Sequence, residues 1–186
     1  MARARAAHPG KPVEVWAEDE HRLGLRPVRR RAWAPEGARP IASGHHRYEW
    51  LQVVAFVQPT SGETVWYLAT GLSKPFFEAL LAGFARRVGA GRTRHIVLVL
   101  DSAGWHGPEG LAVPEGISLV FLPPYTPELQ PAERLWPLVD EAVANRHFAT
   151  LHALDAAVAR RCRRLDADTI RPHTDFHWWP RTAKPR

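Results

Sequence analysis

The chain has 186 residues and a formal net charge of +6, and 45% of its residues are hydrophobic, including eight tryptophans. A chain of this length buries one good core, so we expect one globular domain. The single cysteine, Cys162, excludes an internal disulfide. No signal peptide or apolar run of membrane-spanning length is present, so we expect a cytoplasmic protein without a membrane partner.

The positive charge comes mainly from arginine, whose planar guanidinium suits phosphate groups. Nucleic acid is therefore the first partner that the composition suggests. At the N-terminus, residues 1–12 are small, basic and punctuated by proline, which predicts a flexible basic lead-in.

The folded domain is predicted to begin at Val13 with the strand VEVWAED. Its alternation has period two, so Asp19 shares a face with Val13 and Val15. The next segment, residues 21–40, is rich in Gly, Pro and Arg and lacks apolar periodicity. We expect a loop or an irregular hairpin there.

Residues 48–59 and 64–70 read as two strands joined by a short turn that contains glycine. Residues 73–88 carry apolar side chains at helical spacing, and Ser73 is a candidate N-cap. Two apolar runs without alternation, HIVLVLD ending at Asp101 and ISLVFL, predict strands covered on both faces.

A helix is predicted from Pro131 to Val143 and another over residues 151–165. This order of elements favours an α/β fold, a mixed sheet of three antiparallel strands followed by parallel additions. We place the domain over residues 13–165 and a C-terminal tail, loosely docked from residue 171, over 166–186.

Three carboxylates stand where this fold would let them meet. Asp19 and Asp101 each close an apolar strand, and ligands of open α/β sheets usually bind at strand ends. Glu133 begins the helix after the stiff segment PPYTPELQP. Three clustered acids need a divalent cation to stay ionised, and oxygen ligands suit Mg²⁺ or Mn²⁺. Two such ions about 3.5–4 Å apart would activate a water or a 3'-hydroxyl and stabilise the leaving oxygen of a phosphodiester.

Each acid also has a purely structural interpretation. Asp19 fits a solvated strand end and Asp101 an ordinary turn residue. Glu133, two residues after Pro131, fits a helix N-terminal glutamate that interacts with the helix dipole. The histidines lack regular ligand spacing, so zinc is not predicted.

Four segments together resemble one family: AEDEHRLGL, RRRAWAPEGARP, LVLDSAGWH and LPPYTPELQPAERLW. They are similar to the catalytic domain of the insertion-sequence-630 (mariner-like) transposases, which are DDE-type endonucleases. The resemblance runs from about Val13 to about Leu165. It departs from the family where Ser102 and Gln130 replace asparagines, which changes the reach of two hydrogen-bonding side chains.

The resemblance implies an RNase H-like fold, a mixed five-stranded sheet with helices on both faces. It also implies that Asp19, Asp101 and Glu133 are the catalytic and metal-binding acids, with two Mg²⁺ ions for which Mn²⁺ substitutes. His106 matches a family histidine and would orient a phosphate or a carboxylate, or cap a loop.

Arginines close to Asp19 are candidate contacts to DNA phosphates: Arg22, Arg26, Arg29, Arg30 and Arg31. A second cluster fits phosphate contacts and a solvated charged face equally well: Arg160, Arg161, Arg163 and Arg164. Several tryptophans are expected to be core or loop anchors: Trp33, Trp50, Trp66, Trp105 and Trp136.

The predicted function is metal-dependent cleavage of DNA at transposon ends and strand transfer into target DNA, with TA targets implied by the family. We expect a homodimer or higher oligomer on DNA, associated with the bacterial nucleoid. The alternatives are an inactive relic that binds DNA nonspecifically and another RNase H-like nuclease. Family members carry helix-turn-helix domains ahead of the catalytic domain, which the residues before Val13 are too few to form, so we expect an upstream helix-turn-helix polypeptide or fused domain.

Overall fold

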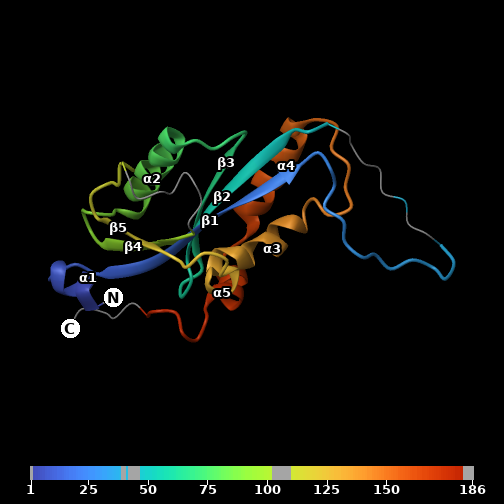
Figure 1. Ribbon diagram of the computed structural model, residues 1–186. Coiled ribbons are helices and arrows are strands. Elements are labelled where there is room, and N and C mark those ends of the chain that lie inside the picture. Colours follow the sequence, from blue (N-terminus) through green and yellow to red (C-terminus); the bar gives the residue numbers. More distant parts are fainter. Residues whose placement is uncertain (1, 39–40, 42–46, 102–109, 182–186) are drawn as a thin grey trace.

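The fold is built on one five-stranded sheet with the strand order β3-β2-β1-β4-β5 (Figure 1). The computed structural model describes residues 2–38, 41, 47–101 and 110–181. The strands are β1 Val13–Gly24, β2 Trp50–Gln58, β3 Glu63–Ala69, β4 His95–Leu100 and β5 Ile117–Phe121. The pairs β1–β2 and β2–β3 are antiparallel, whereas β1–β4 and β4–β5 are parallel. The predicted mixed sheet is therefore confirmed.

Helices cover both faces of this sheet, as predicted (Figure 1). The α-helices are α1 Ala2–Ala7, α2 Lys74–Val88, α3 Trp136–Asp140, α4 Leu151–Arg164 and α5 Ala167–Thr174, and the 3₁₀ helices are η2 Pro127–Leu129 and η3 Pro131–Leu135. Helix α2 packs on one face, and η3, α3, α4 and α5 pack on the other. None of the described helices combines the length and apolarity that a membrane crossing requires.

The alternating side chains of β1 divide between the two cores. Val13, Val15 and Ala17 belong to the core under α3, α4 and α5, whereas Trp16 packs with α2. Asp19 follows in the same alternation and contacts Trp136, so it lies on the face of the two valines, as predicted. The strand alternation thus directs the Asp19 carboxyl group to the helical layer that carries Glu133.

Strand β1 is longer than the sequence predicted. Its last residues, expected to form a loop from His21, continue the pairing with β2 as far as Gly24 opposite Trp50. Buried Leu23 extends the alternation, and the missing side chain of Gly24 makes room for the Trp50 ring, which would lie 2.6 Å from a Cβ there. Beyond the strand, residues 29–38 are exposed and extend away from the body as an arm (Figure 1).

The expected role of the tryptophans as anchors holds only in part. Trp136 is buried, but Trp33 in the arm is fully exposed, so the prediction is wrong for Trp33. Trp105 lies outside the described residues.

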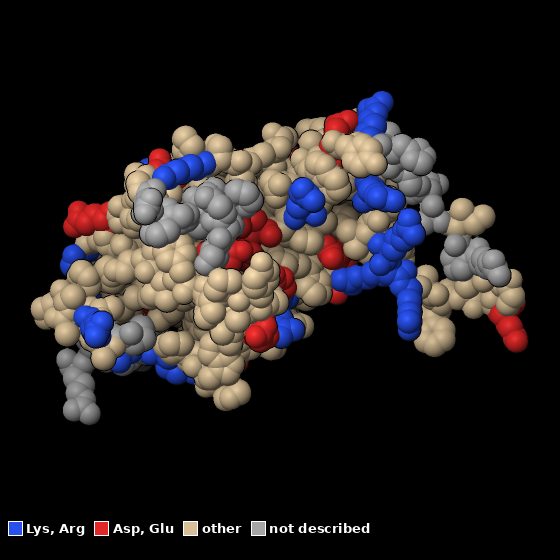
Figure 2. All heavy atoms as spheres, in the orientation of Figure 1, with Lys and Arg blue, Asp and Glu red and all other residues tan. Residues whose placement is uncertain are grey.

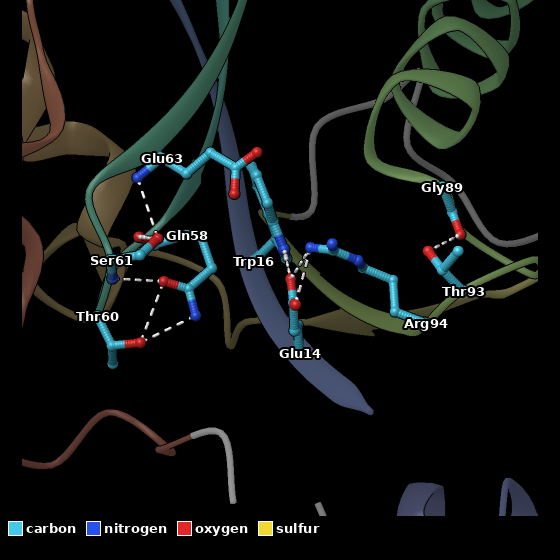
Figure 3. A network of polar contacts seen from close by, with 9 residues as sticks. All are labelled: Glu14, Trp16, Gln58, Thr60, Ser61, Glu63, Gly89, Thr93 and Arg94. Atoms are coloured by element: carbon cyan, nitrogen blue, oxygen red, sulfur yellow. Dashed lines mark hydrogen bonds and ion pairs between the residues drawn. The ribbon is translucent and has the colours of Figure 1, made fainter. Parts of the chain in front are cut away.

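Polar contacts hold the N-terminal end of β1 and the β2–β3 turn in place (Figure 3). The carboxylate of Glu14 accepts from Trp16 Nε1 at 3.0 Å and from Arg94 Nη1 at 2.8 Å, which ties β1 to the residue just before β4. In the turn, Gln58 Oε1 accepts from the backbone N–H of Ser61 at 2.5 Å. The hairpin predicted from the Ser-Gly-Glu sequence is therefore confirmed, with Gln58 ordering its turn.

The helix predicted from Pro131 to Val143 divides into two parts. The first is the 3₁₀ helix η3, and an α-helix begins only at Trp136. Pro137 lacks the backbone N–H that a continuous α-helix would direct to the carbonyl of Glu133. The Trp136 N–H bonds to that carbonyl instead, in the i→i−3 pattern of a 3₁₀ turn.

The two terminal segments are more regular than expected. Residues 2–7, predicted as part of a flexible lead-in, form α1, which buries none of its side chains. The predicted loosely docked tail is wrong as far as residue 179, because α5 buries Ile170 and Thr174 and Trp179 is also buried. The Thr174 hydroxyl donates to the Pro59 carbonyl at 3.2 Å, which fixes α5 to the end of β2.

We expect Ile170→Ala to lower the free energy of unfolding by about 2–4 kcal/mol, because it leaves a cavity beneath a docked helix. Thr169→Ala, an exposed change in the same helix, should cost less than about 0.5 kcal/mol. Urea unfolding followed by tryptophan fluorescence measures both. Equal stabilities of the two variants would mean that α5 is not part of the cooperative core.

Candidate active site

The three predicted acids line one hollow of about 470 Å³ at the ends of the central strands. Asp19 is buried, whereas Asp101 and Glu133 are partly exposed. The hollow is completed by Gln130 and by the proline-rich segment 122–127. The structure therefore brings Asp19 and Glu133 into one hollow although they are more than a hundred residues apart in the sequence.

The sheet register accounts for the meeting of the first two acids. Ala17 of β1 pairs with Val99 of the parallel strand β4, so Asp19 and Asp101 both follow two residues later on adjacent strands. In parallel strands such residues emerge at the same end of the sheet. Glu133 comes from η3, which contacts β1.

Gln130 fixes the start of η3 against β1. Its side chain is buried and donates from Nε2 to the backbone carbonyl of Glu18 at 2.8 Å. Its Oε1 accepts from the Ala132 N–H at 3.5 Å, which caps the 3₁₀ helix. The glutamine that departs from the family asparagine thus connects Glu133's helix with the backbone next to Asp19.

Trp136 contacts Asp19 directly. Its indole Nε1–H donates to Asp19 Oδ2 at 2.8 Å in a buried hydrogen bond. The indole stacks on the His21 ring at a centroid distance of 5.0 Å, and His21 Nε2 lies 2.9 Å from Asp140 Oδ1. The sequence indicated only an anchor at Trp136, although its position one helical turn after Glu133 was a usable signal that both face the same site.

Burial raises the pKa of Asp19 to about 8, and the nearby charge of Glu133 adds to this effect. The hydrogen bond from Trp136 acts in the opposite direction and lowers the pKa. Asp19 is therefore costly to ionise without a cation beside it. A divalent cation would offset both the desolvation of Asp19 and its repulsion from Glu133.

The donor set suits a hard cation, because it consists of carboxylates and includes no thiolate. In the described part of the chain, no group of three or more His, Cys, Asp or Glu side chains is already arranged as a metal site. The three acids therefore share the hollow without forming a closed set of ligands. This hollow fits Mg²⁺ or Mn²⁺ better than zinc.

The arginines predicted to contact DNA are all exposed, and they lie on β1, in the arm and in the segment between the two: Arg22, Arg26, Arg29, Arg30 and Arg31. Arg22 lies over the Trp50 ring, 4.5 Å from its centroid. Arg30 Nη2 donates to the Pro137 carbonyl at 2.6 Å, which ties the base of the arm to α3. Figure 2 shows basic side chains near the arm, to the right of acidic ones at the centre of this face.

The remaining predicted residues are His106, Ser102 and the second arginine cluster. His106 and Ser102 lie outside the described residues. The second arginine cluster is divided in two: Arg163 lines a separate hollow beside β3, whereas the other three line a common hollow in which Arg161 pairs with Glu141.

We expect Asp19→Asn to stabilise the metal-free protein as pH rises. With a folded pKa near 8 against 3.8 unfolded, the folded state binds the extra proton in this window, so wild-type stability falls between about pH 4 and pH 8. The variant lacks this loss and should be more stable by more than about 2 kcal/mol at pH 8, since one pKa unit corresponds to about 1.4 kcal/mol. Urea unfolding at several pH values measures the difference, and a gap that does not depend on pH would contradict it.

Trp136→Phe tests the hydrogen bond within the same titration. Phenylalanine keeps a ring beside His21 but removes the N–H that lowers the pKa of Asp19. The loss of stability should therefore extend to higher pH than in the wild type. NMR titration of the Asp19 carboxyl carbon measures the pKa directly, and Trp66→Phe is the control outside the site.

Comparison with known proteins identifies the family of this chain. The family model described as DDE superfamily endonuclease matches residues 14–155. An uncharacterized protein of Sinorhizobium fredii, y4pE/y4sA, is 37% identical over 100 residues, which cover 53% of this chain and 73% of that protein.

Solved structures share the fold at low identity. The Mos1 transposase paired-end complex with the left transposon end matches with a TM-score of 0.65 and 13% identity, over 92% of this chain and 54% of that chain. A simian T-cell lymphotropic virus intasome in complex with the PP2A regulatory subunit B56 gamma matches with a TM-score of 0.54 and 12% identity, over 95% of this chain and 59% of that one. The chain thus spans about half the length of the Mos1 transposase.

These matches confirm the predicted RNase H-like fold. The family model covers most of the chain, including all three acids of the hollow. The chain belongs to the DDE superfamily endonucleases.

Proposed function

We propose that this domain is the catalytic domain of a transposase, which cleaves DNA at transposon ends and joins the 3' end to target DNA. The observation that carries the proposal is the shared hollow of Asp19, Asp101 and Glu133 in a chain of the DDE endonuclease family. Several structurally similar chains come from Mos1 transposase complexes. One is the paired-end complex with the left transposon end, and another is the strand transfer complex.

Asp19, Asp101 and Glu133 would hold the divalent cations, with Mg²⁺ as the expected metal. Mos1 paired-end complexes with Mn and with Mg support this choice. When bound, such ions lower the pKa of an attacking water or 3'-hydroxyl and stabilise the leaving oxygen. Because the pKa of Asp19 is raised to about 8, its carboxyl group releases a proton when it becomes a ligand.

The surrounding residues keep the acids in place for this reaction. Trp136 holds one oxygen of Asp19, and Gln130 holds the start of the helix that carries Glu133. Trp136 and Gln130 are both buried, so these two contacts limit how far the acids must move to surround a cation.

DNA phosphates are the proposed partners of the exposed arginines in β1 and the arm. Arg29 and Arg31 flank Arg30, whose guanidinium is held by the Pro137 carbonyl. Arg29 and Arg31 are thereby carried on an anchored segment and keep their own heads exposed. We include in the proposal a homodimer or higher oligomer on DNA, which the Mos1 paired-end complexes support.

We expect Asp101→Asn and Glu133→Gln each to slow Mn²⁺-dependent nicking of plasmid DNA at least about 100-fold, or about 2.7 kcal/mol. Asp168→Asn, a change of an exposed carboxylate on α5, should leave the rate unchanged. Mn²⁺ binding, followed by electron paramagnetic resonance, should weaken in the two site variants and not in the control. A wild-type protein that binds DNA and Mn²⁺ without nicking would favour the inactive relic.

For DNA binding, we expect the double variant Arg29→Ala/Arg31→Ala to reduce the slope of log K against log salt by about 1.8, since each phosphate contact contributes about 0.9. The loss should be similar for every duplex sequence, because phosphate contacts carry no base information. Arg92→Ala is the matched control, since Arg92 is exposed before the start of β4, at the opposite end from Asp101. An unchanged slope would show that the arm does not contact the backbone.

A further inference from the structure

The outer edge of β3 is open within the described structure. β3 is the last strand of the sheet and pairs only with β2. Outside that pairing, no backbone hydrogen bond of the described residues reaches Thr64–Leu68. In an antiparallel edge strand every second residue directs its N–H and C=O outward, so this edge offers alternating donors and acceptors.

A groove of about 600 Å³ follows this edge. Its floor consists of the consecutive residues Thr64–Leu68, and its two walls come from opposite faces of the sheet. Gly83 and Arg87 of α2 form one wall, while Ala159, Cys162 and Arg163 of α4 form the other. The groove is therefore a slot along a strand edge, with a helix on each side.

The side chains of β3 alternate between these walls. Val65 and Tyr67 pack with the α2 core, whereas Trp66 and Leu68 pack against the α4 core. Gly83 contributes to this arrangement, because a Cβ there would lie 2.9 Å from the Tyr67 hydroxyl. An added strand would meet an aromatic residue of β3 on each face.

The groove is positively charged on both walls. Arg87 and Arg163 are exposed, neither forms an ion pair among the described residues, and no lining residue is acidic. The positive charges of Arg87 and Arg86 also act on Tyr67, where they oppose the rise in pKa that burial causes. Charge complementarity therefore points to an anionic occupant.

We propose that this groove binds an extended acidic segment of a partner polypeptide, which adds a sixth strand to the sheet beside β3. Consecutive side chains of a strand point to opposite faces, so two successive acidic residues would reach Arg87 and Arg163 respectively. The backbone of the segment would satisfy the alternating donors and acceptors of the β3 edge. This site is separate from the hollow of the three acids and shares no lining residue with it.

Two other occupants fit less well. A second copy paired through its own β3 would set the arginines of one groove against those of the other, and like charges repel. A DNA backbone would satisfy the arginines, but phosphate oxygens only accept hydrogen bonds. The outward carbonyls of β3 would then gain no donor.

Isotope-edited NMR of the whole chain tests the proposal with synthetic peptides. The probe is a β-prone octapeptide of valine and threonine with two adjacent glutamates at its centre, and the matched control has lysines in their place. We expect chemical shift changes at Thr64–Leu68, Arg87 and Arg163 with the glutamate peptide only. Amide exchange at alternate β3 residues should slow at least about tenfold.

Charge reversal supplies the second measurement. The double variant Arg87→Glu/Arg163→Glu should lose the glutamate peptide and bind the lysine peptide, while Arg160→Glu, on the same helix outside the groove, should behave as wild type. Equal responses to both peptides in the wild type would overturn the proposal. Protection of β3 by duplex DNA alone, or by self-association at higher protein concentration, would also overturn it.

Discussion

The hydrogen bond between the Trp136 indole and the buried Asp19 carboxylate is the contact on which the site depends. It joins the central strand of the sheet to the helical segment that carries Glu133. A second buried contact, from Gln130 to the Glu18 carbonyl, joins the same two elements one residue away. Because both contacts are polar and buried, shifting the helix along the strand would leave buried groups without partners.

The fold accepts an electrostatic cost at the same place. Asp19 is buried and lies near Glu133, and its burial and this neighbouring charge raise its pKa to about 8. A carboxylate kept in such surroundings destabilises the metal-free protein and becomes favourable only when a cation arrives. Charges of opposite sign occupy neighbouring parts of the molecule, with the acids in the central hollow and the arginines on the adjacent strand end and the arm.

The two faces of the sheet carry cores of different composition, and only one of them carries the residues of the site. The core under α2 is aromatic, with Phe56 stacked on Phe84 and Trp16 packed edge-on against Phe84. The opposite core receives η3 and α3, which bring the residues of the site, and α5 closes it from the C-terminal side. Packing α5 against the β2–β3 turn requires Gly62, since a Cβ there would lie 2.3 Å from the Ala167 carbonyl.

The sequence by itself determined where the strands follow one another along the chain, which face of the first strand carries Asp19, and that Asp101 stands at a strand end. Those features follow from periods of two and from runs of apolar residues, which are local properties of the chain. It also determined the proline-rich approach to Glu133, because proline restricts the backbone wherever it stands.

Only the tertiary structure decided which side chains support the acids. The partnership of Trp136 with Asp19 spans 117 residues and depends on how η3 meets β1, which no local pattern encodes. The same holds for α5. Its eight residues place only Ile170 and Thr174 in the core, and two buried positions are too few for a helical pattern to be recognised in the sequence. The arginines of α4 also look equivalent in sequence, yet helix geometry turns Arg163 toward a different hollow from the other three, because successive residues point about 100° apart.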